Sequence, residues 1–396
     1  ILSDIDDFDE INGRFGLKCG DEILKQFSMC MQSCINENQK IYELGNGRFI
    51  IMDLANHSKE DILELYDELK KSVEVALEEN VYRVVYTISV GIVEIDKEMK
   101  DYDTLIKYSD FALNEAKKKG KNSCYFFTQD KYKQFIRRRE IRVELQNAVD
   151  HNFKNFDVYY QPIIDIHTRN LIGAEALMRF KMKRNEQIEF ISPAEFIPIL
   201  EESGLIIPAG RWILRQAVAC CKKWQEFIPE FKVNVNLSYV QIIKSKILDE
   251  IKQALKDFNL KPALLGIEVT ESGYLENTYH YKKLWSSLKE EGITLILDDY
   301  GTGYSNAYRL SDLTPHYIKI DRVLTQKALS SNYERSILIY IIEMAHSLKL
   351  NVCIEGVETE EELQEIKKLN PDYIQGYLFG KPAPEDEFYN RQIKKK

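Results

Sequence analysis

Two adjacent aspartates, Asp298 and Asp299, end a short apolar run, and a loop with Gly301 and Gly303 follows them. An apolar run bounded by turn residues is typical of a β-strand that is buried on both faces. Neighbouring residues of a strand point to opposite faces, so both carboxylates reach one site only if the chain turns near Asp299, as the glycines permit. A divalent metal ion would offset the repulsion between the two acids. The alternative is a helix N-cap in an ordinary strand–helix unit, where aspartate is common.

Short apolar strands alternate with helical stretches from about residue 156 onward. We predict strands near 158–163, 171–179, 232–237, 265–270, 293–298, 316–321, 352–356 and 373–376. We predict helices near 193–203, 208–226, 240–257, 278–291, 333–349 and 359–369. This alternation predicts an α/β architecture, a TIM-type (β/α)8 barrel, whose chemistry lies at the carboxyl ends of the strands.

Polar side chains stand at nearly every one of those strand ends. They are Glu175, Asn236, Glu268, Asp298, Asp299, Lys319, Asp321, Glu355, Glu358 and Gln375. Each alone has a structural explanation, such as a cap at Asn236 or an ion pair between Lys319 and Asp321. Together, so many polar groups converging in a core would be costly without a ligand, so we expect a binding or catalytic site at this mouth.

The composition limits the partners and the compartment. The 396 residues suit two domains, and the net charge of −9 argues against nucleic acid or anionic membrane as the main partner. Seven cysteines without metal-site or redox spacing favour a reducing cytoplasm, and we find no membrane-spanning run or signal peptide. We therefore expect a cytoplasmic protein, or the cytoplasmic part of a longer, membrane-bound one. Because the chain opens at Ile1 inside a predicted strand, we expect a fragment that lacks its upstream sensory domain.

The first third of the chain has an α+β pattern. We predict strands at 1–5 and 81–95, and a hairpin over 41–54 whose turn contains Gly45 and Gly47. We predict helices at 20–34, 59–77 and 102–119. A charged, helical stretch over 130–150 lacks proline and glycine, which favours a connecting helix over a flexible linker. We expect one domain at 1–127, a connecting helix at 128–150 and a second domain at 151–396.

Two segments of the first domain, DIDDFDEINGRFGLKCGDEIL at 4–24 and DFALNEAKKKGKN at 110–122, resemble the GGDEF domain of diguanylate cyclases. That nucleotidyl-cyclase-like family joins two GTP molecules into cyclic di-GMP. The signature turn departs from the family, because Gly47 replaces its acidic metal ligand and Arg48 its catalytic acid. The resemblance implies that Asp4 keeps one metal-ligand position. Phosphoryl transfer needs carboxylate-held metal ions, so we expect a degenerate domain without cyclase activity.

The resemblance also implies that a guanine nucleotide still binds there. Asn12 and Asp21 match the pair that reads guanine in this family, and Lys117 and Lys121 match its phosphate-contacting pair. We expect GTP to bind as a regulator, with Arg48 offsetting the missing metal charge. The alternative is that Asn12 and Asp21 are turn and cap residues and that the lysines form a solvated helix end.

A second resemblance covers roughly residues 140 to 390. Its segments are YQPI at 159–162, GAEALMRF at 173–180, SPAEFIPILEESGLI at 192–206, VNVNLS at 233–238, IEVTES at 267–272, DDYGTGYSN at 298–306, IKID at 318–321, IEGVET at 354–359 and QGYLFGKP at 375–382. These segments resemble the EAL domain, a family of cyclic di-GMP phosphodiesterases that produce linear pGpG. Only conservative departures occur, such as Tyr300 for Phe and Asn306 for Ser.

Site roles follow from this second resemblance. Metal ligands would be Glu175, Asn236, Glu268 and Asp298, with Asp298 and Asp299 bridging to a second ion. Glu355 would be the general base and Lys319 would help to orient the water. Substrate-binding candidates are Gln161, Arg179, Gln375, Asp321 and Glu358, while Glu271 would position the 299–306 loop at a homodimer interface. Oxygen-rich ligands suit two Mg²⁺ or Mn²⁺ ions, which would clamp the phosphodiester and activate a water.

Two functions of different classes fit these residues. The first is a cyclic di-GMP phosphodiesterase regulated by a degenerate GGDEF domain. The second is a non-catalytic cyclic di-GMP receptor that signals through a partner. The complete acidic set favours the enzyme, because a receptor has no use for paired metal ions. A working bifunctional cyclase is opposed by Gly47 and Arg48.

Overall fold

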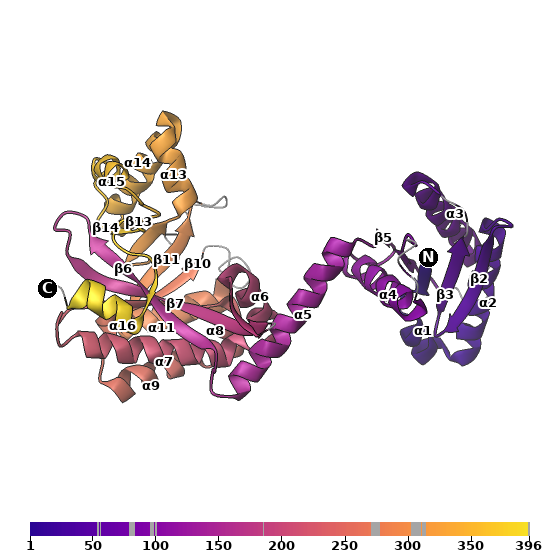
Figure 1. Cartoon of the computed structure of the whole chain (residues 1–396), viewed down its shortest axis with the longest axis horizontal. Coiled ribbons are helices and arrows are strands. Elements are labelled where there is room, and N and C mark those ends of the chain that lie inside the picture. Colours follow the sequence, from indigo (N-terminus) through magenta and orange to yellow (C-terminus); the bar gives the residue numbers. More distant parts are fainter. Residues whose placement is uncertain are drawn as a thin grey trace. The chain divides into compact units, whose positions relative to one another are not determined.

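The computed structural model describes residues 1–53, 55, 57–78, 84–95, 99, 101–184, 186–270, 278–301, 310 and 314–394, without the side chains of 78 and 278–281. The chain divides into two compact units, Ile1–Arg137 and Arg138–Lys396. The helix α5 (Gln129–Asp150) crosses this boundary (Figure 1). No helix in the described ranges is long and apolar enough to cross a membrane.

The first unit is built on a five-stranded sheet in the order β2-β3-β1-β4-β5. Its strands are β1 (Leu2–Ile5), β2 (Gln39–Gly45), β3 (Arg48–Asp53), β4 (Ile88–Ile92) and β5 (Cys124–Phe126). Its helices are α1 (Phe8–Phe15), α2 (Leu17–Cys34), α3 (Lys59–Glu78) and α4 (Tyr102–Lys118). The α+β fold is confirmed, while α1 and β5 were not predicted and β4 is shorter than the expected strand at 81–95.

The predicted hairpin of the first unit is present, with β2 antiparallel to β3. Its turn holds Gly45, Asn46 and Gly47 at φ 85°, 52° and 80°, a left-handed conformation that glycine adopts without steric cost. The core beneath the sheet includes Phe27 and Phe49, whose rings meet edge to face at 5.2 Å. The hairpin therefore places Arg48 at the start of β3, where it pairs with Asp4 of β1.

The second unit contains a closed ring of eight strands, which confirms the barrel prediction. They are β6 (Phe156–Asp165), β7 (Leu171–Arg184), β9 (Lys232–Asn236), β10 (Leu265–Thr270), β11 (Thr294–Tyr300), β12 (Tyr317–Ile320), β13 (Asn351–Glu355) and β14 (Tyr373–Gln375). The ring order is β6-β14-β13-β12-β11-β10-β9-β7, and β7 pairs back to β6.

One strand of the ring departs from the all-parallel arrangement of a regular (β/α)8 barrel. The strand β6 is antiparallel to both β7 and β14, whereas the other neighbouring strands of the ring are parallel. The tight turn after β6 explains this, because the Asp165 carboxylate accepts hydrogen bonds from the backbone of His167 and Thr168. A parallel crossover needs a dozen or more residues, so this short connection produces a hairpin.

Further elements surround the ring. The helices are α6 (Pro193–Ser203), α7 (Ile206–Trp224), α8 (Tyr239–Lys244), α9 (Ile247–Phe258), α11 (Thr278–Glu290), α13 (Arg322–Ser330), α14 (Asn332–Ser347), α15 (Glu360–Lys367) and α16 (Glu385–Phe388), with short η1 (Pro262–Leu264) and η2 (Tyr389–Ile393). Two added strands are β8 (Gln187–Ile191) and β15 (Ala383–Pro384). The single helix predicted at 240–257 is two helices, and α13 and β8 were not predicted.

The helix α5 packs into both units through different halves. In the first unit, Tyr132 and Phe135 of α5 contact the ring of Phe111 at centroid distances of 5.3 and 5.2 Å. In the second unit, Ile141 and Leu145 are fully buried in the barrel core. The helix is continuous between these contacts. A change in the packing of one half therefore has a covalent route to the other.

Candidate functional site

Lys319 is the centre of a buried charged cluster at the carboxyl ends of the barrel strands. Its Nζ lies 2.9 Å from Glu175 Oε2, 2.9 Å from Glu268 Oε2, 3.4 Å from Asp298 Oδ1 and 2.6 Å from Glu355 Oε1. The lysine is 1% exposed. Strands β7, β10, β11, β12 and β13 each contribute one of these five side chains. The barrel thus brings together polar residues at strand ends that are far apart in the sequence.

Glu175 is held in this cluster by three donors. Asn236 Nδ2 donates to its Oε1 at 2.7 Å, and Gln375 Nε2 donates to its Oε2 at 2.7 Å. Gln375 also donates to Gln161 Oε1 at 3.1 Å, and Lys319 is the third donor to Glu175. A carboxylate with this many donors is fixed in orientation. The side-chain Oδ1 of Asn236 takes no part in that hydrogen bond, so its lone pairs remain available to a metal ion.

The charges of the cluster do not balance. Burial lowers the pKa of Lys319, but Asp298, Glu175, Glu268 and Glu355 together raise it well above its ordinary value, so the lysine stays protonated. Burial raises the pKa of Glu175, yet Lys319 and its other donors bring the net pKa below its ordinary value. Burial, followed by repulsion from Glu175, raises the pKa of Glu268 well above its ordinary range. One ammonium therefore does not satisfy the acids around it, and a further cation would be favoured.

Asp298 and Asp299 reach their positions through a bulge rather than a turn. The strand β11 runs on to Tyr300, and its pairing with β12 shifts register between Leu297 and Tyr300. Asp299 has a φ of 57°, and its N–H donates to Asp298 Oδ1 at 2.9 Å. The expected turn at Asp299 is therefore wrong, because a bulge adds the residue that reorients the strand. Burial, and then repulsion by Asp298, raises the pKa of Asp299 to about 6.

The residues present fit a divalent metal ion. One oxygen from each of Glu175, Glu268 and Asp298 lies within 4.8 Å of the others, and all three residues are buried. Asn236 adjoins them through Glu175. Carboxylate and amide oxygens are the ligands that Mg²⁺ and Mn²⁺ prefer. The excess of carboxylates over the single Lys319 ammonium also favours a bound cation.

Two cavities open beside the cluster. The smaller, about 260 Å³, is polar, and its walls include Gln161, Glu175, Asp298, Lys319, Arg322, Glu355, Glu358 and Gln375. The larger, about 630 Å³, has apolar walls with Arg179, Asn236, Glu268 and Thr270 among them. Leu177 lines both cavities. The metal-ligand candidates thus separate two compartments, an arrangement that suits an extended ligand with its reacting bond in the middle.

The substrate-binding candidates fall in different places. Glu358 lines the smaller cavity and pairs with Arg322 at 2.7 Å. Arg179 lines the larger cavity, where its guanidinium lies 5.4 Å from the ring centroid of Tyr159. Asp321 lines neither of these cavities. Its carboxylate accepts a hydrogen bond from the Val323 N–H at 2.7 Å and caps α13.

Sequence reasoning missed two residues at this site. Arg322 follows the IKID segment directly and brings a partly exposed guanidinium to the smaller cavity. Asn234 stands two residues before Asn236, and its amide contacts Glu268. Side chains alternate along a strand with a period of two, so Asn234 lies on the same face as Asn236. This alternation could have predicted Asn234 at the site. Glu271 and the loop at 302–306 lie outside the described residues.

In the first unit, Arg48 forms ion pairs with two acids. Arg48 Nη2 contacts Asp110, and Arg48 Nε lies 3.8 Å from Asp4 Oδ2. Lys117 Nζ lies 2.9 Å from Asp4 Oδ1, and Lys121 Nζ lies 2.6 Å from Asp7 Oδ1. Two cations therefore flank Asp4, the acid that we predicted to keep a metal-ligand position.

Asn12 and Asp21 belong to neighbouring helices. A Cβ added at Gly20 would lie 1.9 Å from Asn12 Oδ1, so Gly20 lets the asparagine pack against α2 beside Asp21. The buried Asn12 Oδ1 has no hydrogen-bond partner among the described residues, while Asp21 is exposed. Asn12 thus packs against α2 at the residue before Asp21, whose side chain is exposed to solvent.

Family models match both units. The model described as EAL domain matches residues 142–382, and that described as diguanylate cyclase, GGDEF domain, matches residues 1–123. The signaling protein YkoW of Bacillus subtilis is 31% identical over 390 residues, which are 97% of this chain and 48% of that protein. The cyclic di-GMP phosphodiesterase PdeR of Escherichia coli is 28% identical over 399 residues, covering 100% of this chain and 59% of that one. The chain spans about half the length of these curated relatives.

Solved structures resemble the barrel unit. The PaMucR phosphodiesterase in complex with c-di-GMP has a TM-score of 0.59 and 29% identity, and it covers 63% of this chain and 99% of its own. The FimX EAL domain from Pseudomonas aeruginosa bound to c-di-GMP has a TM-score of 0.55 and 25% identity, covering 61% of this chain and 96% of its own.

Proposed function

The chain belongs to the EAL domain family and carries a GGDEF domain ahead of its barrel, and on that premise we propose that it hydrolyses cyclic di-GMP to linear pGpG. The observation that carries the proposal is the convergence of Glu175, Glu268, Asp298 and Glu355 on Lys319 at the barrel mouth. Relatives named as cyclic di-GMP phosphodiesterases, and a similar phosphodiesterase solved with c-di-GMP, support the substrate.

The chain's own residues divide the work. Glu175, Asn236, Glu268 and Asp298 would hold a divalent cation, and Asp298 with Asp299 would bridge to a second. Such cations, when bound, neutralise the charge of the phosphodiester and of the departing oxygen. The Glu355 carboxylate would accept a proton from the attacking water, because burial raises the pKa of this group to about 8 and makes it basic enough. Lys319, held within 2.6 Å of Glu355 Oε1, would orient that water.

The two cavities support a substrate with two arms. One nucleotide half would enter the larger, apolar-walled cavity, where Arg179 offers a planar guanidinium to phosphate. The other half would enter the smaller cavity, where Arg322 plays the same part. The scissile phosphodiester would then lie at the carboxylates between them. This arrangement would also place the metal ligands against the phosphate rather than against either base.

The competing function is a receptor that binds cyclic di-GMP without cutting it. Incubation of the chain with cyclic di-GMP and Mn²⁺, followed by chromatography of the nucleotides, distinguishes the two. We expect pGpG to accumulate in proportion to enzyme, and no product with EDTA. Glu226→Gln alters an exposed acid after α7. It is the control for loss of a surface carboxylate and should retain full activity. Recovery of intact substrate bound to the protein would instead establish the receptor.

We further propose that the first unit has lost cyclase activity. Arg48 carries a positive charge where the family has a catalytic acid, and it already pairs with Asp4 and Asp110. We expect no cyclic di-GMP from GTP and Mg²⁺ in a Glu355→Gln background that cannot degrade the product. Product formation in that background would contradict this assignment and make the chain bifunctional.

A further inference from the structure

One metal-ligand candidate is supported from outside the barrel mouth. The amide nitrogen of Asn234, on β9, donates to Glu268 Oε1 at 2.8 Å and to the Tyr317 hydroxyl at 2.5 Å. Asn234 is 2% exposed and Tyr317 is 8% exposed. A primary amide has two donor hydrogens, so these two contacts use both and fix the plane of the amide.

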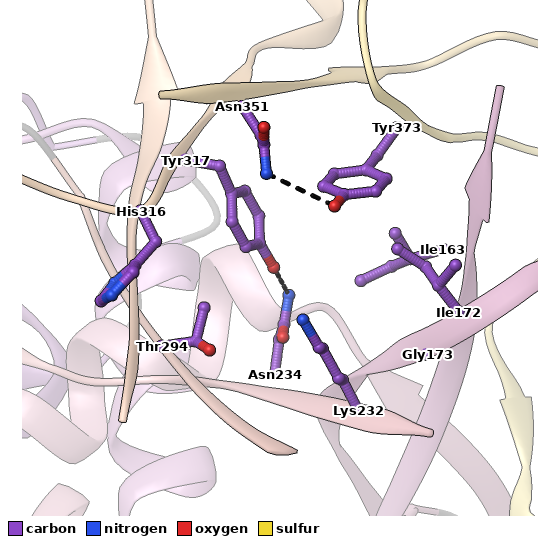
Figure 2. Close-up of a pocket in the computed structure, with 10 residues that line it drawn as sticks. All are labelled: Ile163, Ile172, Gly173, Lys232, Asn234, Thr294, His316, Tyr317, Asn351 and Tyr373. Carbon is purple, nitrogen blue, oxygen red and sulfur yellow. Dashed lines mark hydrogen bonds between the residues drawn. The ribbon is translucent and has the colours of Figure 1, made fainter. Parts of the chain in front are cut away.

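This contact lies on the far side of the cluster from the substrate cavities. Asn234 and Tyr317 line a separate cavity of about 150 Å³ near the amino-terminal ends of the parallel strands, where Figure 2 shows them pointing toward one another. Asn351 and Tyr373 form a second hydrogen-bonded pair in its wall, at 3.4 Å. Among the described residues that line this cavity, only the Asn234–Tyr317 pair has a hydrogen bond to a member of the charged cluster around Lys319. Glu268 thus receives its support from the end of the barrel opposite the mouth.

We propose that Asn234, itself held by Tyr317, is a positioning residue that presents Glu268 to the metal ion. The inference rests on the metal site of the proposed function. With Oε1 occupied by the asparagine, the carboxylate is prevented from rotating, and Oε2 stays toward Lys319 at 2.9 Å. Hydrogen bonds to a metal ligand from outside its coordination shell fix the ligand's orientation and strengthen metal binding.

Glu268 needs this support more than Glu175 does. Glu175 has donors from Asn236, Gln375 and Lys319, all within reach of the mouth. Among the described residues, Glu268 shares only Lys319 with that set, and Asn234 provides its other hydrogen bond. Loss of Asn234 should therefore leave Glu268 free to turn away from the cluster.

Gly266 offers a way to disturb the contact without removing the amide. A Cβ at this position would lie 2.3 Å from Asn234 Oδ1 and 2.8 Å from Ile296 Cδ1. Gly266→Ala therefore displaces the asparagine side chain while leaving its chemistry intact. Asn351→Ala is the matched control, because it removes an amide from the same cavity that does not contact Glu268.

The test is calorimetric titration of the full chain with Mn²⁺ alone, followed by hydrolysis assays across Mn²⁺ concentrations. We expect Asn234→Ala and Gly266→Ala to weaken Mn²⁺ binding roughly 10- to 100-fold. Tyr317→Phe should weaken it roughly 3- to 10-fold, the size of one hydrogen bond. Asn351→Ala should bind like the parent. Turnover should return at saturating Mn²⁺, a recovery that damage to the fold would not show.

The outcomes separate this role from the metal site itself. A parent chain that binds no Mn²⁺ would overturn both. A parent that binds, with folded Asn234→Ala and Gly266→Ala variants that bind equally tightly, would overturn the role of Asn234 alone. If Asn234→Ala does not fold, Tyr317→Phe decides, because it removes a single oxygen atom and unchanged affinity in it would contradict the proposal.

Discussion

Single residues around Lys319 determine whether the barrel mouth is a catalytic centre or a structural ion cluster. In a structural cluster, removal of one acid relieves repulsion and leaves function elsewhere unaffected. In a catalytic centre, removal of one acid costs metal affinity. Replacing each of the four carboxylates around Lys319 with its isosteric amide distinguishes a catalytic centre from a structural ion cluster.

Glu175→Gln and Asp298→Asn should each lower hydrolysis by more than about 100-fold at saturating Mn²⁺, because loss of a direct ligand exceeds the loss of an outer contact. Both variants should remain folded, because each amide has the shape of the carboxylate it replaces, and burial already raises the pKa of Asp298 above its ordinary value. Steady-state rates and circular dichroism measure these effects. Parental turnover in either variant would exclude the metal-site assignment.

Glu355→Gln should bind substrate normally and lose about 10²- to 10⁴-fold in turnover, the usual contribution of a general base. Burial raises the pKa of Glu355 to about 8, with Asp298 and Glu175 adding to the rise and Lys319 opposing it. A base must be ionised to act, so the parental rate should climb with pH and level off above this pKa. Bound cations lower the pKa, which places the climb at or below about pH 8.

The pH profile of kcat and calorimetry with cyclic di-GMP check this prediction. Glu355→Gln should lack the ascending limb that the parent shows. Lost affinity with preserved turnover would instead make Glu355 a binding residue.

At the scale of elements, Asp321 has a structural role as the N-cap of α13, and this role can be distinguished from substrate binding. Its carboxylate caps the helix that follows β12, and asparagine caps helices about as well as aspartate. Asp321→Ala should lower the free energy of unfolding by about 0.5–2 kcal/mol, whereas Asp321→Asn should preserve both stability and hydrolysis. Urea unfolding and steady-state rates measure the pair. A stable but inactive Asp321→Asn variant would assign the carboxylate to the substrate instead.

At the scale of the whole molecule, α5 is the covalent route by which the first unit would regulate the second. Its Phe135 packs in one unit and its Leu145 in the other. A ligand shifts such an equilibrium only by its differential affinity for the active arrangement. The ion pairs of Lys117 and Lys121 are partly exposed, at 32% and 45%, so a triphosphate can compete for these lysines at small cost.

We therefore expect GTP to bind the first unit and to raise hydrolysis by roughly 5- to 150-fold at most. Binding should survive EDTA, because Arg48 already supplies positive charge beside Asp4. Calorimetry with GTP, and rates with and without it, test the prediction. ATP is the control ligand, and Asn12→Ala with Asp21→Ala should abolish both GTP effects. If GTP neither binds nor changes the rate, the first unit is a scaffold.

The sequence by itself determined the class of fold and the convergence of polar strand ends at one mouth. Apolar runs ending in polar residues predicted the barrel strands, and the rule that strand ends meet at one mouth brought Glu175, Glu268, Asp298 and Lys319 together. These are local properties, since the alternation of buried and polar residues is imposed by strand geometry within each segment. The α+β pattern of the first unit followed from the same local periodicities.

Only the tertiary structure decided how those residues share charge and support. The antiparallel β6, the bulge that sets Asp299 and the contact of Asn234 with Glu268 all depend on which strands become neighbours. Asp321 shows the same limit, because its cap became visible only once α13 was found to begin at the next residue. Periodicity places a side chain on a face, but its partner comes from another strand, and that pairing depends on the closure of the ring.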